Sequence, residues 1–157
     1  MLATAQLTDH TQLLETLNTL LSFCKDGQQG FADAAENSST SRVKSFMHKQ
    51  EQNRSKLSLE LIKLIEDYGG QADDSGSLIG SLHRVWLATK DIMTSRDDDA
   101  LIQECIRGEE AALEAYENAL ESTLPFDVHE KIKHQKEQLE TVKNELQELL
   151  ASPARVS

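Results

Sequence analysis

Apolar residues recur at steps of three and four in four long segments of the chain, which is the spacing of one helix face. The first helix is predicted to begin after a capping Thr8 or Asp9 and to end in the polar run 37–41. The second ends at Gly69-Gly70, where glycine adopts a left-handed capping conformation. The two predicted stripes are Leu13, Leu17, Leu20, Cys24, Gly27, Phe31 and Ala34, and Val43, Phe46, Gln50, Asn53, Leu57, Leu61, Leu64 and Tyr68.

The second half of the chain repeats this pattern. A third helix is predicted over about 97–121, where three aspartates suit the positive end of its dipole. A fourth helix follows Leu124-Pro125. Their stripes are Leu101, Ile102, Cys105, Ile106, Glu109, Leu113, Tyr116 and Leu120, and Val128, Ile132, Gln135, Leu139, Val142, Leu146 and Leu149. The short connection inside each half predicts two antiparallel helical hairpins.

Residues 71–96 join the two predicted hairpins and are long enough to traverse the bundle. They contain a loop over 73–77 and a short helix with Leu78, Leu82, Val85, Trp86 and Ile92 on one face. We therefore predict an all-α fold, a ferritin-like four-helix bundle of two antiparallel hairpins joined by a long crossover. Alternatively, a helix from Ser77 to Met93 is a fifth full member of an ordinary bundle. We expect one domain over 1–157, with its core over about 9–150 and a polar tail over 151–157.

Each predicted stripe is interrupted near its middle by polar or small residues. Counted from the two hairpin turns, the interruptions lie at similar distances, roughly 12 to 15 residues, and so form one layer of the bundle. Four-helix bundles that bind a cofactor hold it in such a layer. The interruptions are Gly27, the patch from Gln50 to Arg54, Glu109 and Gln135. A simpler interpretation is that Gly27 and Gly108 allow close helix approach while the polar groups turn outward.

A dinuclear iron or manganese centre in such a bundle needs one Glu from each of two helices and Glu-x-x-His from each of the other two. The second helix offers Glu51-Gln-Asn-Arg54, and the fourth offers Glu140-Thr-Val-Lys143 or the reversed His134-Gln-Lys-Glu137. The first helix supplies only the neutral Gln28 and Gln29, and the third supplies Glu109 or Glu110. This set has too few carboxylates for two divalent cations.

The guanidinium of Arg54 stays protonated and repels a metal ion. We therefore predict a metal-free polar core of Gln50, Arg54, Glu109 and Gln135, in which Arg54 pairs with Glu109 or Glu51 and the two glutamines complete the hydrogen bonds. No catalytic or cofactor-binding residue is predicted. The alternative is a single iron or manganese ion, for which the candidate ligands are His48, Glu51, Glu109, Glu110, His134 and Glu137.

Composition narrows the classes of function. The chain has 16 Lys and Arg against 27 Asp and Glu, a net charge of -11 that repels phosphate backbones and anionic lipids. Nucleic acid and membrane are therefore not expected partners. No apolar run approaches the roughly 20 residues of a membrane span, and residues 1–6 lack a signal-peptide pattern, so we expect a cytoplasmic protein. Cys24 and Cys105 are interpreted as reduced core residues. The absence of Gly-x-Ser-x-Gly and of a phosphate-binding loop argues against hydrolases and kinases.

Three segments resemble a bacterial ferritin-like family of unknown function, found mostly in proteobacteria. They are Lys25-Asp-Gly-Gln-Gln-Gly-Phe31, Ser75-Gly-Ser-Leu-Ile-Gly-Ser-Leu-His-Arg-Val-Trp86 and Arg107-Gly-Glu-Glu-Ala-Ala-Leu-Glu-Ala-Tyr116. The resemblance spans residues 10–150 and implies the ferritin-like bundle but no activity. Members of that family carry acidic residues where Gln28 and Gln29 stand here, and a His near Lys143, so this chain departs from the family where a metal would bind.

Two classes of function follow. The first is a non-catalytic helical protein that acts, in stress or envelope physiology, through self-association or a protein partner. A homodimer is expected because Leu14, Leu21, Phe23 and Leu59 lie off the main stripes. The second is a metal-dependent oxidoreductase or iron-handling protein, which fold analogy and Glu51 and Glu109 at matching heights favour.

Overall fold

The computed structural model describes the backbone of residues 2–73 and 97–151, and side chains from residue 9 onward. Within these residues the chain forms four helices and no strand: α1 (Leu2–Asn37), α2 (Ser41–Asp67), α5 (Asp98–Glu121) and α6 (Phe126–Ala151). The all-α prediction is confirmed for this part of the chain. The predicted helix over Ser77 to Met93 and the tail from Ser152 lie outside the described residues.

The predicted start of the first helix after Thr8 or Asp9 is wrong, because α1 begins at Leu2. Residues 2–7 include Ala, Gln and Leu and contain neither Gly nor Pro, so nothing in them opposes continuation of the helix. The other predicted ends agree more closely with the structure. Thr40 caps α2 by accepting a hydrogen bond from the Val43 amide, and Gly69 follows α2 with φ at 80°.

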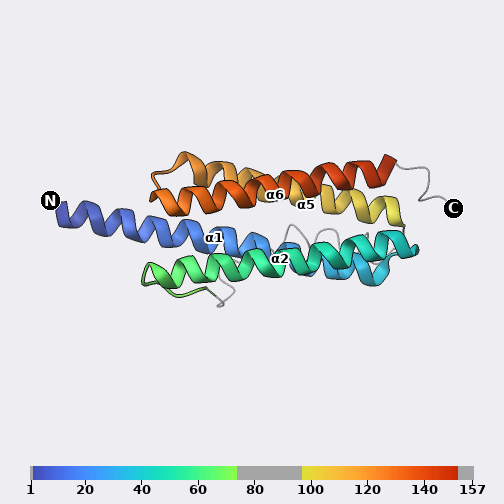
Figure 1. Cartoon of the computed structure of the whole chain (residues 1–157), viewed down its shortest axis with the longest axis horizontal. Helices are drawn as coiled ribbons and strands as arrows, with labels where there is room; N and C mark the ends of the chain where they lie inside the picture. Colours follow the sequence, from blue (N-terminus) through green and yellow to red (C-terminus); the bar gives the residue numbers. More distant parts are fainter. Residues whose placement is uncertain (1, 74–96, 152–157) are drawn as a thin grey trace.

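The four helices lie side by side along one long axis (Figure 1). α1 packs against α2 and α5, and α6 packs against α5 and α2, so α2 and α5 face each other across a diagonal of the bundle. The Tyr68 hydroxyl, just beyond α2, donates to Oδ1 of Asp127 at the start of α6 at 2.7 Å. The start of α5, by contrast, contacts the start of α2. α2 and α5 therefore run in the same direction, and the chain leaves α2 at one end of the bundle and enters α5 at the other.

Asp98 joins the start of α5 to the turn between α1 and α2. One carboxylate oxygen accepts from the amide and hydroxyl of Ser39 at 2.8 and 3.1 Å, and the other accepts from the amide and hydroxyl of Thr40 at 3.2 and 2.9 Å. The neighbouring Asp97 caps α5 by accepting from the backbone amides of residues 99 and 100. The aspartates were predicted to serve the helix dipole alone. In the structure, Asp98 also stabilises a contact between distant parts of the chain.

The apolar interior consists of two clusters along the bundle axis. One contains Leu17, Leu61 and Ile132, and the other contains Phe31, Met47 and Leu146. The predicted stripe of the fourth helix is confirmed at every position, since all seven of its residues are buried in α6.

The predicted stripes of the other helices need correction. On α2, Asn53 is exposed and Met47 is buried, because the buried arc includes the contact with α1 as well as the bundle axis. Leu21, placed off the main stripe of the first helix, is fully buried. The reason is that α1 packs against both α2 and α5, and its buried arc is therefore wider than one stripe. Leu59 does lie outside the core and is 65% exposed.

Candidate functional site

Arg54 of α2 and Glu109 of α5 form an ion pair across the diagonal of the bundle, between Nη2 and Oε2. Both side chains are buried, Arg54 at 3% and Glu109 at 1% exposure. A charge-assisted hydrogen bond in such a dry environment is short and strong, yet the loss of hydration offsets much of its benefit to stability. The pair therefore mainly fixes which groups meet at the centre of the bundle.

α1 contributes two residues to this centre. The Phe31 ring lies under the guanidinium, with 5.5 Å between the Arg54 Cζ atom and the ring centroid, and this distance permits a cation–π contact. Gly27 lies against the same guanidinium, because a Cβ atom at this position would lie 3.0 Å from Nη1 of Arg54. Three helices thus enclose one guanidinium.

Burial and charge act in opposition on both members of the pair. Burial raises the pKa of Glu109, and the Arg54 charge and hydrogen bond oppose that rise. Burial is the largest single influence on the pKa of Arg54 and lowers it, but the charge and hydrogen bond of Glu109 together with the nearby Cys24 and Tyr116 outweigh burial and leave the pKa raised. Arg54 is therefore a cation at physiological pH. A fixed positive charge therefore occupies the middle of the bundle.

A second polar network lies about one helical turn away and includes residues from all four helices. The Tyr116 hydroxyl of α5 donates to Oε1 of Gln135 on α6 at 2.7 Å. Nε2 of Gln135 donates to the Leu57 carbonyl at 3.3 Å and to Oε1 of Glu60 at 2.9 Å, both on α2. The Cys24 thiol of α1 lies 3.2 Å from the Tyr116 oxygen, and the thiol is the donor because the tyrosine proton is already directed to Gln135.

The two networks change the acidity of the groups they contain. Burial raises the pKa of the Cys24 thiol, and the nearby Arg54 charge only partly opposes that rise. Burial likewise raises the pKa of the Tyr116 phenol well above its ordinary value. The thiol and the phenol are therefore neutral at physiological pH. This neutrality makes Cys24 a hydrogen-bond donor and a poor nucleophile.

The structure places all four residues of the predicted polar layer in the interior: Gln50, Arg54, Glu109 and Gln135. Of the two partners predicted for Arg54, Glu109 is the one that it contacts, whereas the partners of the two glutamines differ from the prediction. Among the described residues, Arg54 pairs with Glu109 and not with Glu51, and Oε1 of Gln50 accepts from Nδ2 of Asn53 at 3.3 Å. Gln135 bonds to the Leu57 carbonyl, which lies about a turn beyond Arg54 on α2, so it does not reach the ion pair.

The candidate metal ligands are not brought together. His48 and Glu51 lie one turn apart on α2, with 3.4 Å between Nδ1 of His48 and Oε2 of Glu51. Glu109 is buried and forms its ion pair with Arg54. The other candidates are exposed: Glu110, His134 and Glu137. Across residues 9–73 and 97–151, no group of three or more His, Cys, Asp or Glu side chains is positioned to hold a metal ion. At the bundle centre, Glu109 is paired with the Arg54 cation, which repels a metal ion, so these two residues do not fit a metal.

Three polar residues with structural roles, Tyr116, Glu60 and Asp98, are not predicted by the sequence pattern. Tyr116 was assigned to an apolar stripe, although a buried tyrosine hydroxyl needs a hydrogen-bond partner. Glu60 was not considered, but its side chain accepts from Gln135 and lies 3.6 Å from Nζ of Lys131 on α6. Asp98 was treated as a local charge. Tyr116 and Gln135 are the residues whose types signal these contacts, since a buried hydroxyl and a buried amide both require hydrogen-bond partners.

A groove of about 330 Å³ between α2 and α6 lies over the polar layer. Gln50, Arg54 and Leu57 line it from α2, and Leu139 and Val142 line it from α6. Lys49, Lys56 and Glu145 also border it. Few backbone contacts join α2 and α6, in keeping with a groove between these helices. This groove is the outer boundary of the site that contains the ion pair.

Residues 12–122 match the family described as "Domain of unknown function (DUF2383)". The chain belongs to the DUF2383 family. A comparison with curated proteins finds no match. The segment shared with DUF2383 contains Gly27, Arg54 and Glu109 and hence the whole ion pair, whereas Gln135 lies beyond it. None of the helices in the described part of this DUF2383 chain is long and apolar enough to cross a membrane.

Proposed function

We propose that this DUF2383 chain is a non-catalytic, ferritin-like helical protein that requires no metal and acts through a protein partner or self-association. The Arg54–Glu109 ion pair is the observation that carries the proposal. A protein guanidinium neutralises Glu109, so the carboxylate best placed to bind a metal is already committed to a protein cation. The site contributes to structure and specificity instead of redox chemistry.

The ferritin-like assignment is supported by the direction of the helices. Two hairpins in which α2 and α5 run in the same direction require a connection that crosses the length of the bundle, and an up-down-up-down bundle has no such connection. In this proposal, residues 1–157 form one domain. The buried cysteines, Cys24 and Cys105, are both free thiols, in keeping with a reducing cytoplasm.

Metal analysis tests the proposal directly. Protein purified without chelator, with and without added Fe(II), is expected to contain far less than one iron or manganese ion per chain. Glu109→Ala and Glu51→Ala should leave that content unchanged. Stoichiometric iron or manganese that disappears in either variant would overturn the metal-independent function, because the loss would identify these carboxylates as ligands.

The second candidate is a metal-binding oxidoreductase or iron-handling protein with a reduced ligand set. It is favoured by the contact between His48 and Glu51, two groups that can bind one ion on the outer side of α2. A site of two protein ligands is open to solvent and binds weakly. Retention of a single ion by wild type but not by His48→Ala would favour this candidate.

Self-association is proposed through the apolar groups that the fold leaves exposed. Leu59 on α2 and Phe126 at the start of α6 are large, exposed hydrophobic residues. A dimer that buries them would remove apolar area from water. Light scattering at high micromolar concentration should then show a mass of twice 17.5 kDa. A single species of 17.5 kDa would refute the dimer.

A further inference from the structure

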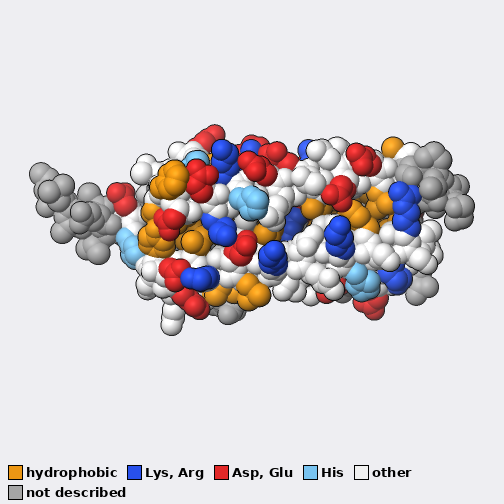
Figure 2. Space-filling view, in the orientation of Figure 1, with side chains coloured by type: hydrophobic (Ala, Val, Ile, Leu, Met, Phe, Trp, Pro, Cys, Tyr) orange, Lys and Arg blue, Asp and Glu red, His pale blue; other side chains and the backbone are white. Residues whose placement is uncertain are grey.

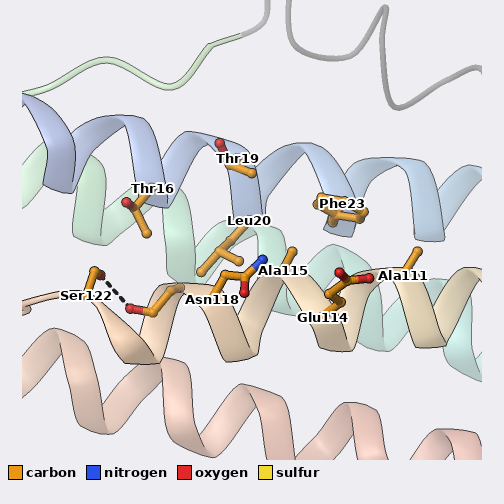
Figure 3. A pocket seen from close by; sticks show the side chains of 10 residues that line it. Thr16, Thr19, Leu20, Phe23, Ala111, Glu114, Ala115, Asn118 and Ser122 are labelled. Atoms are coloured by element: carbon orange, nitrogen blue, oxygen red, sulfur yellow. Dashed lines mark hydrogen bonds between the residues drawn. The ribbon is translucent and has the colours of Figure 1, made fainter.

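A second groove lies between α1 and α5, away from the polar layer. It has a volume of about 390 Å³, and its lining is mostly apolar or small. Leu20 and Phe23 come from α1, and Ala111 and Ala115 come from α5. Figure 3 shows these side chains projecting from the two helices into the space between them, with Thr16 and Ser122 toward one end.

This groove continues toward the N-terminal part of α1. A neighbouring hollow of about 500 Å³ shares Thr16, Thr19 and Ser122 with it and extends to Asp9 on α1 and Leu124 beyond α5. The combined groove runs from residue 9 to residue 23 of α1, which is about 21 Å at 1.5 Å per residue. That length equals about four turns of a helix laid alongside.

The groove lies on the side of the bundle that carries the net negative charge. α1 contains five Asp or Glu and one Lys, and α5 contains eight Asp or Glu and one Arg. α2 and α6 together contain ten acidic and ten basic residues. Figure 2, in which these two helices lie nearest the viewer, shows Lys and Arg intermingled with Asp and Glu. The carboxylates that line the groove are Asp9, Glu15, Glu114 and Glu121.

We propose that the α1/α5 groove is the docking site for a basic amphipathic helix of a partner protein. The apolar face of that helix would pack on Leu20, Phe23 and the alanines of α5, and its Lys or Arg residues would lie beside the groove carboxylates. The small side chains of Ala111 and Ala115 allow a helix backbone to approach closely. This inference rests on the proposed function, since it names the partner surface that a non-catalytic bundle needs.

Charge argues against a second copy as the occupant. The α1/α5 side of another copy is equally acidic, and two such surfaces repel each other. The α2/α6 side of another copy carries balanced charge and so offers no net attraction to the groove. A partner helix with its own excess of basic residues complements both the apolar lining and the acidic surroundings.

Fluorescence anisotropy with a designed peptide tests this surface. The probe is a labelled amphipathic peptide of about four turns with Leu on one face and Lys on the other. The comparisons are a peptide of the same composition in scrambled order and a Leu/Glu peptide with the same pattern. The Leu/Lys peptide should bind at least tenfold more tightly than either comparison, and its affinity should fall as salt is added. Equal binding of the scrambled peptide would overturn the proposal, because charge alone would then explain the attraction.

Matched substitutions locate the binding site. Ala115→Leu fills the α1/α5 groove and should weaken the Leu/Lys peptide at least tenfold, whereas Thr141→Leu in the α2/α6 groove should change its affinity less than twofold. Glu114→Gln should weaken it about two- to threefold, and Glu145→Gln, in the other groove, should not. Circular dichroism and thermal melts confirm that each variant is folded. An unchanged affinity for both Ala115→Leu and Glu114→Gln would reject this groove.

The outcomes for this groove and for the proposed function are separable. Peptide binding that meets these expectations supports the docking site even if metal analysis finds a bound ion. Absence of peptide binding, together with metal-free protein, rejects the basic helix as occupant and leaves the metal-independent function intact. A dimer in light scattering that Ala115→Leu dissociates would make a second copy the occupant and overturn the inference.

Discussion

Gly27 of α1 lies against Arg54 of α2 so closely that a Cβ atom at position 27 would be 3.0 Å from Nη1 of the guanidinium. That nitrogen belongs to a side chain held by Glu109 on one side and by the Phe31 ring on another. The glycine therefore provides the space in which a buried cation can sit. Its effect on stability depends on Arg54, and this dependence can be measured.

The effect of Gly27→Ala on the free energy of unfolding is expected to change sign with the identity of residue 54. In the wild-type background, Gly27→Ala should destabilise the fold by about 1 kcal/mol, because overpacking outweighs the gain in helix propensity of about 1 kcal/mol. In the Arg54→Met/Glu109→Leu background, the same substitution should stabilise by about 0.5–1 kcal/mol. Urea denaturation of the four proteins gives both values. Equal changes in stability in the two backgrounds would show that the effect of Gly27→Ala does not depend on Arg54.

Replacing one member of the ion pair should destabilise the fold more than replacing both members. Arg54→Met leaves Glu109 buried without its cation and is expected to cost about 3–5 kcal/mol. The double variant Arg54→Met/Glu109→Leu should recover most of that loss, because two apolar groups of similar size need no hydration. Equilibrium unfolding in urea measures both. As a control, Lys63→Met breaks an exposed pair with Asp67 and should change stability by less than about 0.5 kcal/mol. Additive costs for the two single substitutions would contradict the coupling.

Asp98 is expected to be the most important of the three aspartates at the start of α5. Asp98→Ala removes four hydrogen bonds to Ser39 and Thr40 and should destabilise the protein by about 2–4 kcal/mol. Asp99→Ala leaves those bonds intact and should cost less than about 1 kcal/mol. Thermal unfolding of both variants compares them. A similar loss for each would indicate that only the helix dipole matters here.

Because its two thiols are buried, the protein is expected to lose stability at alkaline pH. Burial raises the pKa values of Cys24 and Cys105 in the folded protein above those in the unfolded chain. Below about pH 9 the full stability contribution of the neutral thiols is present, and it is lost as pH rises further, because the unfolded state then releases protons first. The urea midpoint should accordingly fall between about pH 9 and pH 11. Cys24→Ala/Cys105→Ala should fall less steeply, and identical slopes would exclude the thiols as the cause.

Reactivity gives a second measurement of the same groups. A disulfide reagent at neutral pH is expected to leave both thiols unmodified in the native protein, since neither is accessible or ionised. In denaturant, both should react at once. Fast modification of the native protein would show that Cys24 or Cys105 is more exposed than the packed interior allows.

Much of the helical arrangement can be predicted from local pattern. The period of the apolar residues in the last helix predicts every buried position of α6, because that helix packs closely against α5 and makes few contacts with α2. The prediction is poorer for α1, where Leu21 is buried against expectation. A helix with two close neighbours buries a wider arc, and the sequence does not state how many neighbours a helix has.

Some features of the candidate site can likewise be predicted from the sequence, and others depend on the tertiary structure. By itself the sequence determined which residues are candidates for a polar layer, namely Gln50, Arg54, Glu109 and Gln135, because each interrupts an apolar stripe near its middle. The tertiary structure decided that these four side chains are buried. Only the tertiary structure decided their partners: Glu109 for Arg54, and Tyr116 with Glu60 for Gln135. Periodicity fixes direction and height along one helix, whereas hydrogen bonds depend on differences of a few ångströms between helices that only the packed bundle sets.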